Sequence, residues 1–347
     1  MKKVIRISAI IIILSLLSFM LFLPIEANNT KNETNDEYKT LLDEEFILHD
    51  YETNTDSTFT YRDVVEEYRE LNPEYTNPTE RFIYPKQEAE LLLSKNAIIQ
   101  NNRSIIPGST MYPVSDVTEA PYSGIVMILS KDSSGNNYFG TGYMVSKRVL
   151  VTCAHVVKFD GVYASEIKIY PLLDHDKTVI NGVSSINNVT DYYHPYSWVT
   201  PALYDTTTGE ERDKYDWCYL SLSVPTSSDV GYFNFGPIMD NVQYTYTKVS
   251  GYPMISSGST YLSYDMFDDY EQYNQYTSST GTSMAYNSHR IIHNCSAIGG
   301  QSGSPIYIYM SNYAIGIHTG GGLSNYGIRF YPTLENLIRN KINSLEG

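Results

Sequence analysis

The chain has 347 residues and a formal net charge of −15 at pH 7. From residue 104 onward it has 21 acidic against 13 basic side chains and no basic aromatic cluster, which argues against a nucleic-acid-binding protein. Its three cysteines, Cys153, Cys218 and Cys295, cannot all pair within one chain, and their spacing indicates no metal site.

Residues 1–27 have the pattern of a secretory signal peptide. Lys2, Lys3 and Arg6 precede an apolar run at residues 7–23, and an acceptable small-residue cleavage site follows. The run is nearly long enough to span a bilayer, so an uncleaved anchor is the alternative. The order of charge, apolar run and cleavage site favours the signal peptide, and we expect a secreted, extracellular protein.

Residues 28–103 are acidic, with 17 acidic against 8 basic side chains, and are rich in Asn, Thr and Glu. Helical periodicity occurs at residues 61–71 and 86–96. The segment has too few apolar residues for a core of its own. Two interpretations follow: a pro-segment that covers the protein until secretion, and a disordered spacer.

The acidic segment ends at a sharp boundary. Arg103 closes a polar run, and Ser104 opens an apolar one with Ile105 and Ile106. An arginine in this position is an accessible target for a processing protease. We therefore expect a cut between Arg103 and Ser104.

From residue 122 onward, short β-runs alternate with Gly, Asn, Asp and Ser, which is typical of an all-β barrel or sandwich. One amphipathic helix is expected at residues 333–345, with Leu334, Leu337 and Ile338 on its apolar stripe. The expected strands lie at residues 124–129, 142–145, 149–157, 167–170, 217–222, 242–250, 286–293, 306–309 and 314–317.

A serine flanked by glycines stands in the stretch Gly299-Gly300-Gln301-Ser302-Gly303-Ser304-Pro305. In such a turn the amides of Gly300 and Ser302 can point the same way. Two convergent donors beside a hydroxyl are what acyl transfer needs, because negative charge develops on the carbonyl oxygen under attack. The alternative is a Gly/Ser surface loop.

Two further stretches present a histidine and an aspartate. An apolar strand delivers His155, and Asp216 opens another apolar strand. Taken alone, each has an ordinary structural explanation, as a core histidine and a turn aspartate. Asp205 and Asp213 are poorer candidates because loop-like polar residues follow them directly. The order His155, Asp216, Ser302 is the order of the catalytic residues in chymotrypsin-like proteases.

From about Arg103 to its C-terminus, the chain resembles the glutamyl endopeptidase branch of the chymotrypsin-like serine proteases. The stretches that carry the resemblance are Thr152-Cys153-Ala154-His155, Asp216-Trp217-Cys218-Tyr219-Leu220, Gly299-Gly300-Gln301-Ser302-Gly303-Ser304-Pro305, Asn102-Arg103-Ser104-Ile105-Ile106, Gly231-Tyr232-Phe233, Ser250-Gly251-Tyr252-Pro253 and Gly316-Ile317-His318-Thr319-Gly320-Gly321.

The resemblance implies an all-β fold of two packed antiparallel six-stranded β-barrels with a C-terminal helix. A signal peptide and a partly helical or disordered pro-segment would precede them, and the resemblance favours the pro-segment over the spacer. The implied organisation is a signal peptide at 1–27, an acidic pro-segment at 28–103 and a serine protease domain at 104–347, with its first barrel at about 104–225, its second at about 226–332 and its helix at 333–345.

The implied activity is that of a secreted serine endopeptidase made as a latent precursor. Ser302 would attack the peptide carbonyl, His155 would act as base and acid, and Asp216 would orient the imidazole. The amides of Gly300 and Ser302 would hold the oxyanion. No metal or cofactor has a role. The expected partners are protein or peptide substrates and an activating protease that cuts after Arg103, and we expect a monomer.

The resemblance also points to preference for Glu, and less for Asp, before the scissile bond. Ser296 stands where trypsin-like relatives carry an aspartate, and His318 where glutamyl endopeptidases place the histidine that contacts a substrate carboxylate. One departure is Ala297, where those relatives often carry a threonine or serine. By the same resemblance, the new amine of Ser104 adds a second positive charge. The expected substrate-binding residues are His318, Ser296, Ala297, Thr319, Gly320 and Ser104.

Several alternatives stay open: a non-catalytic secreted binding protein or adhesin on the same scaffold, an esterase, and a protease of other specificity. The Tyr-rich acidic insert at 256–288 could line the cleft, hold calcium or form a solvated loop, and the loop is favoured. The Asp-His-Asp run at 174–176 is interpreted as solvent-facing. The cysteines are interpreted as small buried core residues, although Cys153 and Cys218 could pair behind the catalytic residues.

Overall fold

The computed structural model describes residues 42–71, 112–173, 192–237, 246–253, 255–257, 260–262, 267–272, 289–293, 295–297, 299–308, 311–321 and 325–346. The chain divides into two compact units, and all of these residues except Leu42 belong to the second, Asp43–Gly347. The described part contains no helix of the length and apolar character needed to cross a membrane. Outside it lie the expected signal peptide, the 86–96 helix, the Arg103–Ser104 bond and the 174–176 run.

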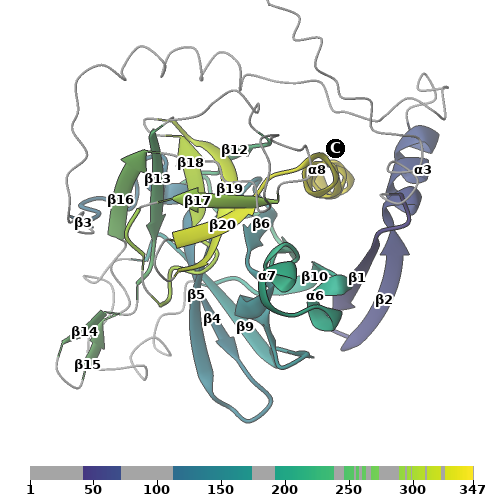
Figure 1. Cartoon of the computed structure of the whole chain (residues 1–347), viewed down its shortest axis with the longest axis horizontal. Helices are drawn as coiled ribbons and strands as arrows, with labels where there is room; N and C mark the ends of the chain where they lie inside the picture. Colours follow the sequence, from purple (N-terminus) through teal and green to yellow (C-terminus); the bar gives the residue numbers. More distant parts are fainter. Residues whose placement is uncertain are drawn as a thin grey trace, which may run out of the picture. The chain divides into compact units, whose positions relative to one another are not determined.

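The first barrel is an antiparallel sheet with the strand order β10-β11-β6-β5-β4-β9. Its strands β5, β4 and β9 lie side by side in Figure 1. A bridge between Ile169 and Tyr193 joins the two ends of this order. All residues of β6 and all but the last of β4 are buried, because both faces of these strands are covered. The strands are β4 (Ile125–Lys131), β5 (Asn137–Met144), β6 (Val149–Thr152), β9 (Glu166–Pro171), β10 (Pro195–Pro201) and β11 (Cys218–Leu222).

Short elements complete the first barrel. Two of them, the short strands β7 and β8, pair with each other as a small antiparallel hairpin. The short elements are η2 (Tyr122–Gly124), α5 (Ala154–Val157), β7 (Lys158–Phe159), β8 (Val162–Tyr163), α6 (Leu203–Thr206) and α7 (Gly209–Asp213).

The second barrel has the order β17-β20-β19-β18-β13-β16, with β3 added on β16 and β12 running parallel to β19. Its interior is a cluster of buried apolar side chains that includes Val249, Ile291 and Ile306. The strands are β3 (Tyr112–Pro113), β12 (Asn234–Phe235), β13 (Tyr246–Gly251), β16 (Phe267–Gln272), β17 (Arg290–His293), β18 (Pro305–Ile308), β19 (Tyr313–Gly321) and β20 (Asn325–Arg329).

The interpretation of the 256–288 insert as a solvated loop is wrong for its described residues. β14 (Ile255–Ser257) and β15 (Thr260–Leu262) form a hairpin, and β16 pairs with β13 along its whole length. The acidic residues Asp268 and Asp269 therefore lie on a strand of the second barrel. The expectation failed because the insert lacks the apolar alternation that marks a half-buried strand.

The chain ends in α8 (Pro332–Glu346), as expected from its apolar stripe. Leu334, Leu337 and Ile338 are buried. At its C-terminal end, Glu346 accepts hydrogen bonds from the Ser146 hydroxyl at 2.7 Å and from the Arg148 backbone N–H at 3.0 Å. The helix is thereby bound to the turn that precedes β6.

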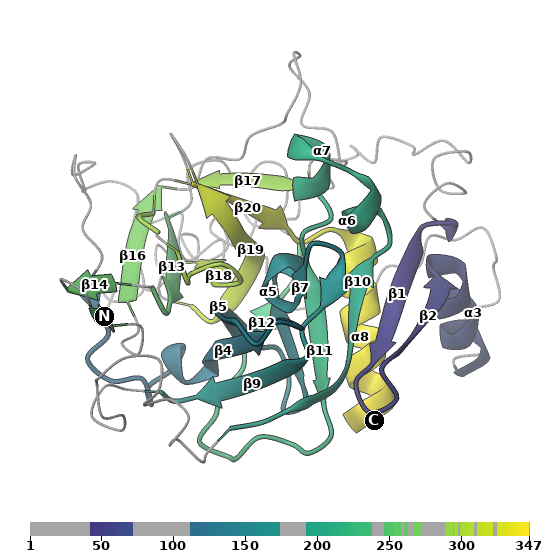
Figure 2. The same ribbon diagram turned by 90° about the horizontal axis from the view of Figure 1, so that it is seen from below.

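Residues 43–71, expected to be helical or disordered, add two strands and a helix to the first barrel. β1 (Glu45–Asp50) pairs with β10 and with β2 (Thr55–Thr60), and α3 (Tyr61–Leu71) follows (Figure 2). The helix has the bounds that the periodicity predicted. The strands were missed because they lie in an acidic stretch and pair through β1 with β10, a partner that local sequence does not reveal.

Glu44, an acidic residue of this segment, should make the stability of the fold depend on pH. The Glu44 carboxyl is partly buried, and burial raises its pKa to about 7. Burial, and then the charge of Glu44, raise the pKa of Tyr331. Burial, and then the charges of Glu211 and Glu44, raise the pKa of Tyr215. A carboxyl whose pKa is higher in the folded state than in the unfolded state contributes to the stability of the fold at low pH. This contribution to stability is lost as the pH rises toward 7.

We expect Glu44→Gln to be more stable than the parent at pH 8 by ~1–3 kcal/mol, and to differ little from it at pH 4.5. Urea unfolding at both pH values measures the difference. Glu45→Gln, at the neighbouring exposed position, is the matched control and should follow the parent. Equal pH dependence in Glu44→Gln and the parent would contradict the assignment.

Candidate active site

His155 and Asp216 lie just beyond the ends of two neighbouring strands of the first barrel. β6 and β11 pair antiparallel with Thr152 opposite Cys218, so the segment that follows β6 and the segment that precedes β11 emerge at the same end of the sheet. His155 lies in α5, not on a strand. The strand expected at 149–157 is therefore wrong in its second half, since β6 ends at Thr152 and the chain turns into a helix.

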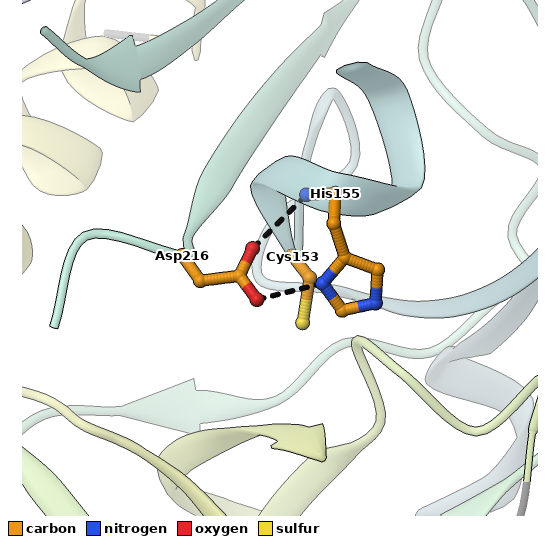
Figure 3. Close-up of side chains that lie close together, drawn as sticks. All are labelled: Cys153, His155 and Asp216. Carbon is orange, nitrogen blue, oxygen red and sulfur yellow. Dashed lines mark hydrogen bonds and ion pairs between the residues drawn. The ribbon is translucent and has the colours of Figure 1, made fainter. Parts of the chain in front are cut away.

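The two side chains are hydrogen-bonded to each other (Figure 3). Asp216 Oδ2 lies 2.6 Å from His155 Nδ1, and Asp216 Oδ1 accepts the His155 backbone N–H at 3.0 Å. Burial alone would lower the pKa of His155, but the charge of Asp216 and its hydrogen bond outweigh burial, so the pKa is raised. Nε2 lies on the side of the ring away from the carboxylate.

Ser302 lies in a glycine turn that leads into β18 of the second barrel. Gly300 and Gly303 have φ values of +95° and +91°, which glycine adopts without steric cost. A Cβ on Gly303 would stand 1.9 Å from the Thr141 carbonyl oxygen, so only glycine fits. The Gly303 N–H donates to the His318 carbonyl at 2.7 Å, which fixes the turn against β19.

Thr141 of β5 binds this turn to the first barrel. Its backbone N–H donates to the Ser302 carbonyl at 2.8 Å, and its hydroxyl donates to the Gly300 carbonyl at 2.9 Å. Among the described residues, the amides of Gly300 and Ser302 donate to no protein acceptor. They remain available to an oxygen atom brought in from outside.

A pocket of about 360 Å³ opens beside Ser302. Ser302, His318, Ala297 and Gly320, all expected from the sequence, lie together in its wall. Sequence reasoning missed Asn325, whose side-chain amide donates to the Cys295 carbonyl at 2.6 Å. The lining residues are Ala297, Gly299, Ser302, His318, Gly320, Gly321 and Asn325.

Two of the expected substrate-binding residues, Thr319 and Ser296, do not line this pocket. Thr319 is buried, and its hydroxyl donates to the Tyr326 carbonyl at 3.4 Å, because successive strand residues point to opposite faces. Ser296 is partly buried and is not among the lining residues. Ser104 lies outside the described residues.

His318 is buried and stands next to a second histidine that sequence reasoning missed. His293 Nε2 lies 3.1 Å from His318 Nδ1. Burial, and then the charge of His155, lower the pKa of His318 to about 4, and burial and His318 lower the pKa of His293. These shifts favour the neutral form of both rings at pH 7, and two neutral imidazoles can share one hydrogen bond as donor and acceptor.

All three cysteines are free and buried, so the possible pairing of Cys153 with Cys218 is not present. The Cys153 thiol donates to the His318 carbonyl at 3.1 Å. Its sulfur lies with His155 Nδ1 and an Asp216 oxygen in a group whose ligand atoms are within 4.8 Å of one another. Burial raises the pKa of Cys153 well above its usual range. The protonated thiol is not the form that binds metal.

Comparisons with known proteins bear on this geometry. No model of a known protein family matches the sequence, and no curated protein matches it. Among solved structures, that of a Glu endopeptidase covers 69% of this chain and 99% of its own, with a TM-score of 0.52 and 17% identity. The protease Anisep from Arthrobacter nicotinovorans covers 68% and 100%, with a TM-score of 0.47 and 18% identity. The thermostable serine protease AL20 from an extremophilic microorganism covers 65% and 98%, with a TM-score of 0.47 and 13% identity.

The fold is therefore the chymotrypsin-like fold of serine proteases. His155 and Asp216 belong to its first barrel and Ser302 to its second. Within that fold, the chain is similar in structure to a Glu endopeptidase.

Proposed function

We propose that the protein is a serine endopeptidase that cleaves peptide bonds through an acyl-enzyme on Ser302. The observation that carries the proposal is the 2.6 Å hydrogen bond between Asp216 and His155 Nδ1. It holds the ring with its proton on Nδ1 and leaves Nε2 as the base. A serine in a glycine turn with two available amides supplies the other parts that acyl transfer requires.

In this mechanism His155 Nε2 takes the proton of the Ser302 hydroxyl as its oxygen attacks the peptide carbonyl carbon. The carbonyl oxygen becomes an oxyanion, which the amides of Gly300 and Ser302 bind. His155 then gives the proton to the leaving amine and the C–N bond breaks. Water attacks the acyl-enzyme in the same way and returns Ser302 to its starting form. Asp216 stabilises the imidazolium in both halves.

We expect Ser302→Ala to lower kcat by about four to six orders of magnitude, because members of a catalytic triad act as a unit. Cleavage of a denatured protein, followed by mass spectrometry, measures the loss. Ser311→Ala, in a turn before β19, is the matched control and should keep full activity. If Ser302→Ala cleaves as fast as the parent, the mechanism is wrong.

The pH profile gives a second readout of the same assignment. His155 must be neutral to act as base, and its pKa is raised. The apparent pKa of the acid limb in the pH profile of kcat/KM should therefore lie above the ordinary histidine value of 6.5. A binding protein or adhesin would show no turnover at any pH. An esterase would hydrolyse activated esters but leave denatured protein intact.

For the specificity of this protease, we propose preference for Glu, and less for Asp, before the scissile bond. His318 is the titratable side chain in the described wall of the pocket. Its Nδ1 faces His293, and its ring also has a hydrogen bond to the Tyr326 backbone that favours the protonated form, so a substrate carboxylate would meet a ring able to take up a proton. A bound carboxylate would also raise the pKa of His318 and favour the charged form. Ala297 offers no hydroxyl as a second donor.

We expect His318→Ala to lower kcat/KM for a Glu peptide relative to its Gln analogue by ~10- to 100-fold, as a lost hydrogen bond to a charged group is worth ~1–3 kcal/mol. Turnover of an activated ester should change little. His194→Ala, which removes an exposed histidine bonded to the Ile167 carbonyl, is the control. Unchanged Glu cleavage in His318→Ala, or a parent that cuts after Phe, Leu, Lys or Arg, would overturn the pocket assignment alone.

We further propose that the protein is secreted as a precursor and cut between Arg103 and Ser104. The acidic segment that ends at an arginine supports this cut. N-terminal sequencing of the active secreted form should give Ser104-Ile105-Ile106 as one of its N-termini. Full activity in a single chain that begins well upstream of Ser104 would contradict it.

A further inference from the structure

One edge of the first barrel is occupied by a strand from the N-terminal segment. In β10, Val199 has Tyr219 of β11 on one side and Leu48 of β1 on the other. The ladder with β1 runs from Phe46 opposite Pro201 to Asp50 opposite Ser197. β1 thus adds a full strand to the open edge of β10, as an extended peptide does when it augments a sheet (Figure 2).

Backbone hydrogen bonds extend this pairing beyond both ends of β1. The Ala202 N–H donates to the Glu45 carbonyl at 3.1 Å, and the Tyr51 N–H donates to the Tyr196 carbonyl at 2.9 Å. Both contacts continue the register of the ladder. The edge of β10 is therefore paired from Tyr196 to Pro201.

Side chains of β1 are buried against the barrel. His49 is 4% exposed and stacks on Trp198, with ring centroids 4.5 Å apart, and on Tyr163 at 4.4 Å. Phe46 is fully buried, 5.9 Å from the ring of Trp217, the residue after Asp216. Aromatic rings packed at these distances resemble a protein core more than a transient surface contact.

The helix of the segment is bound to the C-terminal helix. The side-chain amide of Asn336 in α8 donates to the Tyr61 hydroxyl of α3, and both residues are buried. Asn340 donates to the Glu67 carboxylate at 3.3 Å. None of the described residues 42–71 lines the pocket beside Ser302. The contacts of this segment therefore complete the fold and leave the pocket open.

We propose that residues 43–71 are a permanent part of the folded domain and stay bound to β10 and α8 as a second chain when the polypeptide is cut between residues 71 and 112. β1 of this segment is the strand that pairs with the outer edge of β10. Its docking does not depend on catalysis, so the inference can hold even if the proposed protease activity fails. The cut at Arg103 is relevant only as the natural origin of the second chain.

The test uses the full chain without its first 27 residues, carrying Ser302→Ala, with the recognition sequence of a site-specific protease inserted between Arg103 and Ser104. After complete cutting, gel filtration and intact-mass measurement follow in native buffer. We expect the peptide that contains residues 43–71 to co-elute with the barrels at one to one and to separate only in denaturant. Elution of the peptide as a separate species in native buffer would overturn the proposal.

Hydrogen exchange of the β10 amides gives an independent readout. We expect the amides of Trp198 and Thr200, which face β1 in this register, to stay protected after the cut. A loss of protection of more than tenfold, with intact protection in β11, would show that the edge has opened and would overturn the proposal.

Variants of the segment test which contacts hold it. In the cut protein, His49→Ala should release the peptide at least tenfold faster, because it loses the stack on Trp198. Thr58→Ala, exposed on β2, is the matched control and should release it at the parent rate. Equal release rates for His49→Ala and the parent would contradict the role of the stack. If His49→Ala does not fold, the cut parent still decides the proposal.

Discussion

Thr141 makes the hydrogen bonds on which the relation between the two barrels depends. It is fully buried on β5 of the first barrel, yet it binds the carbonyls of Ser302 and Gly300 in the second. Its own carbonyl accepts the Thr152 hydroxyl at 2.7 Å, and its hydroxyl oxygen accepts the Tyr252 N–H at 3.0 Å. The backbone and side chain of this one residue thus fix the serine turn relative to the end of β6, the strand that leads to the histidine. Buried polar groups satisfied in this way specify a single arrangement of the parts around them.

The surroundings of two histidines in the site shift their pKa values in opposite directions. His155 has a carboxylate within hydrogen-bonding distance, and its pKa is raised. His318 is buried beside another imidazole, and its pKa is lowered. The positive charge on His155 contributes to that lowering, so protonation at one ring opposes protonation at the other. When neighbouring groups have different pKa values, one of them can be protonated while the other is not at the same pH.

The sequence predicts the parts of the site that are local and fails where a part depends on distant pairing. His155, Asp216 and Ser302 each stand in a short stretch whose apolar run or glycines can be read directly, and the structure places the first two in contact. His293 and Asn325 were missed because their positions follow from the register of β17, β19 and β20. β10 was missed because prolines at both of its ends interrupt the strand pattern, and β1 because it lies in an acidic stretch.

The position of the N-terminal segment has a consequence for the order of folding. Tyr61 and Asn336, which are hydrogen-bonded, are 275 residues apart in the chain. β1 and α3 are synthesised first, but β10 and α8, which bind them, are made much later. Closing so long a loop is entropically costly, and chains rich in distant contacts fold slowly. The earliest part of this domain to be made is therefore among the last that can reach its final place.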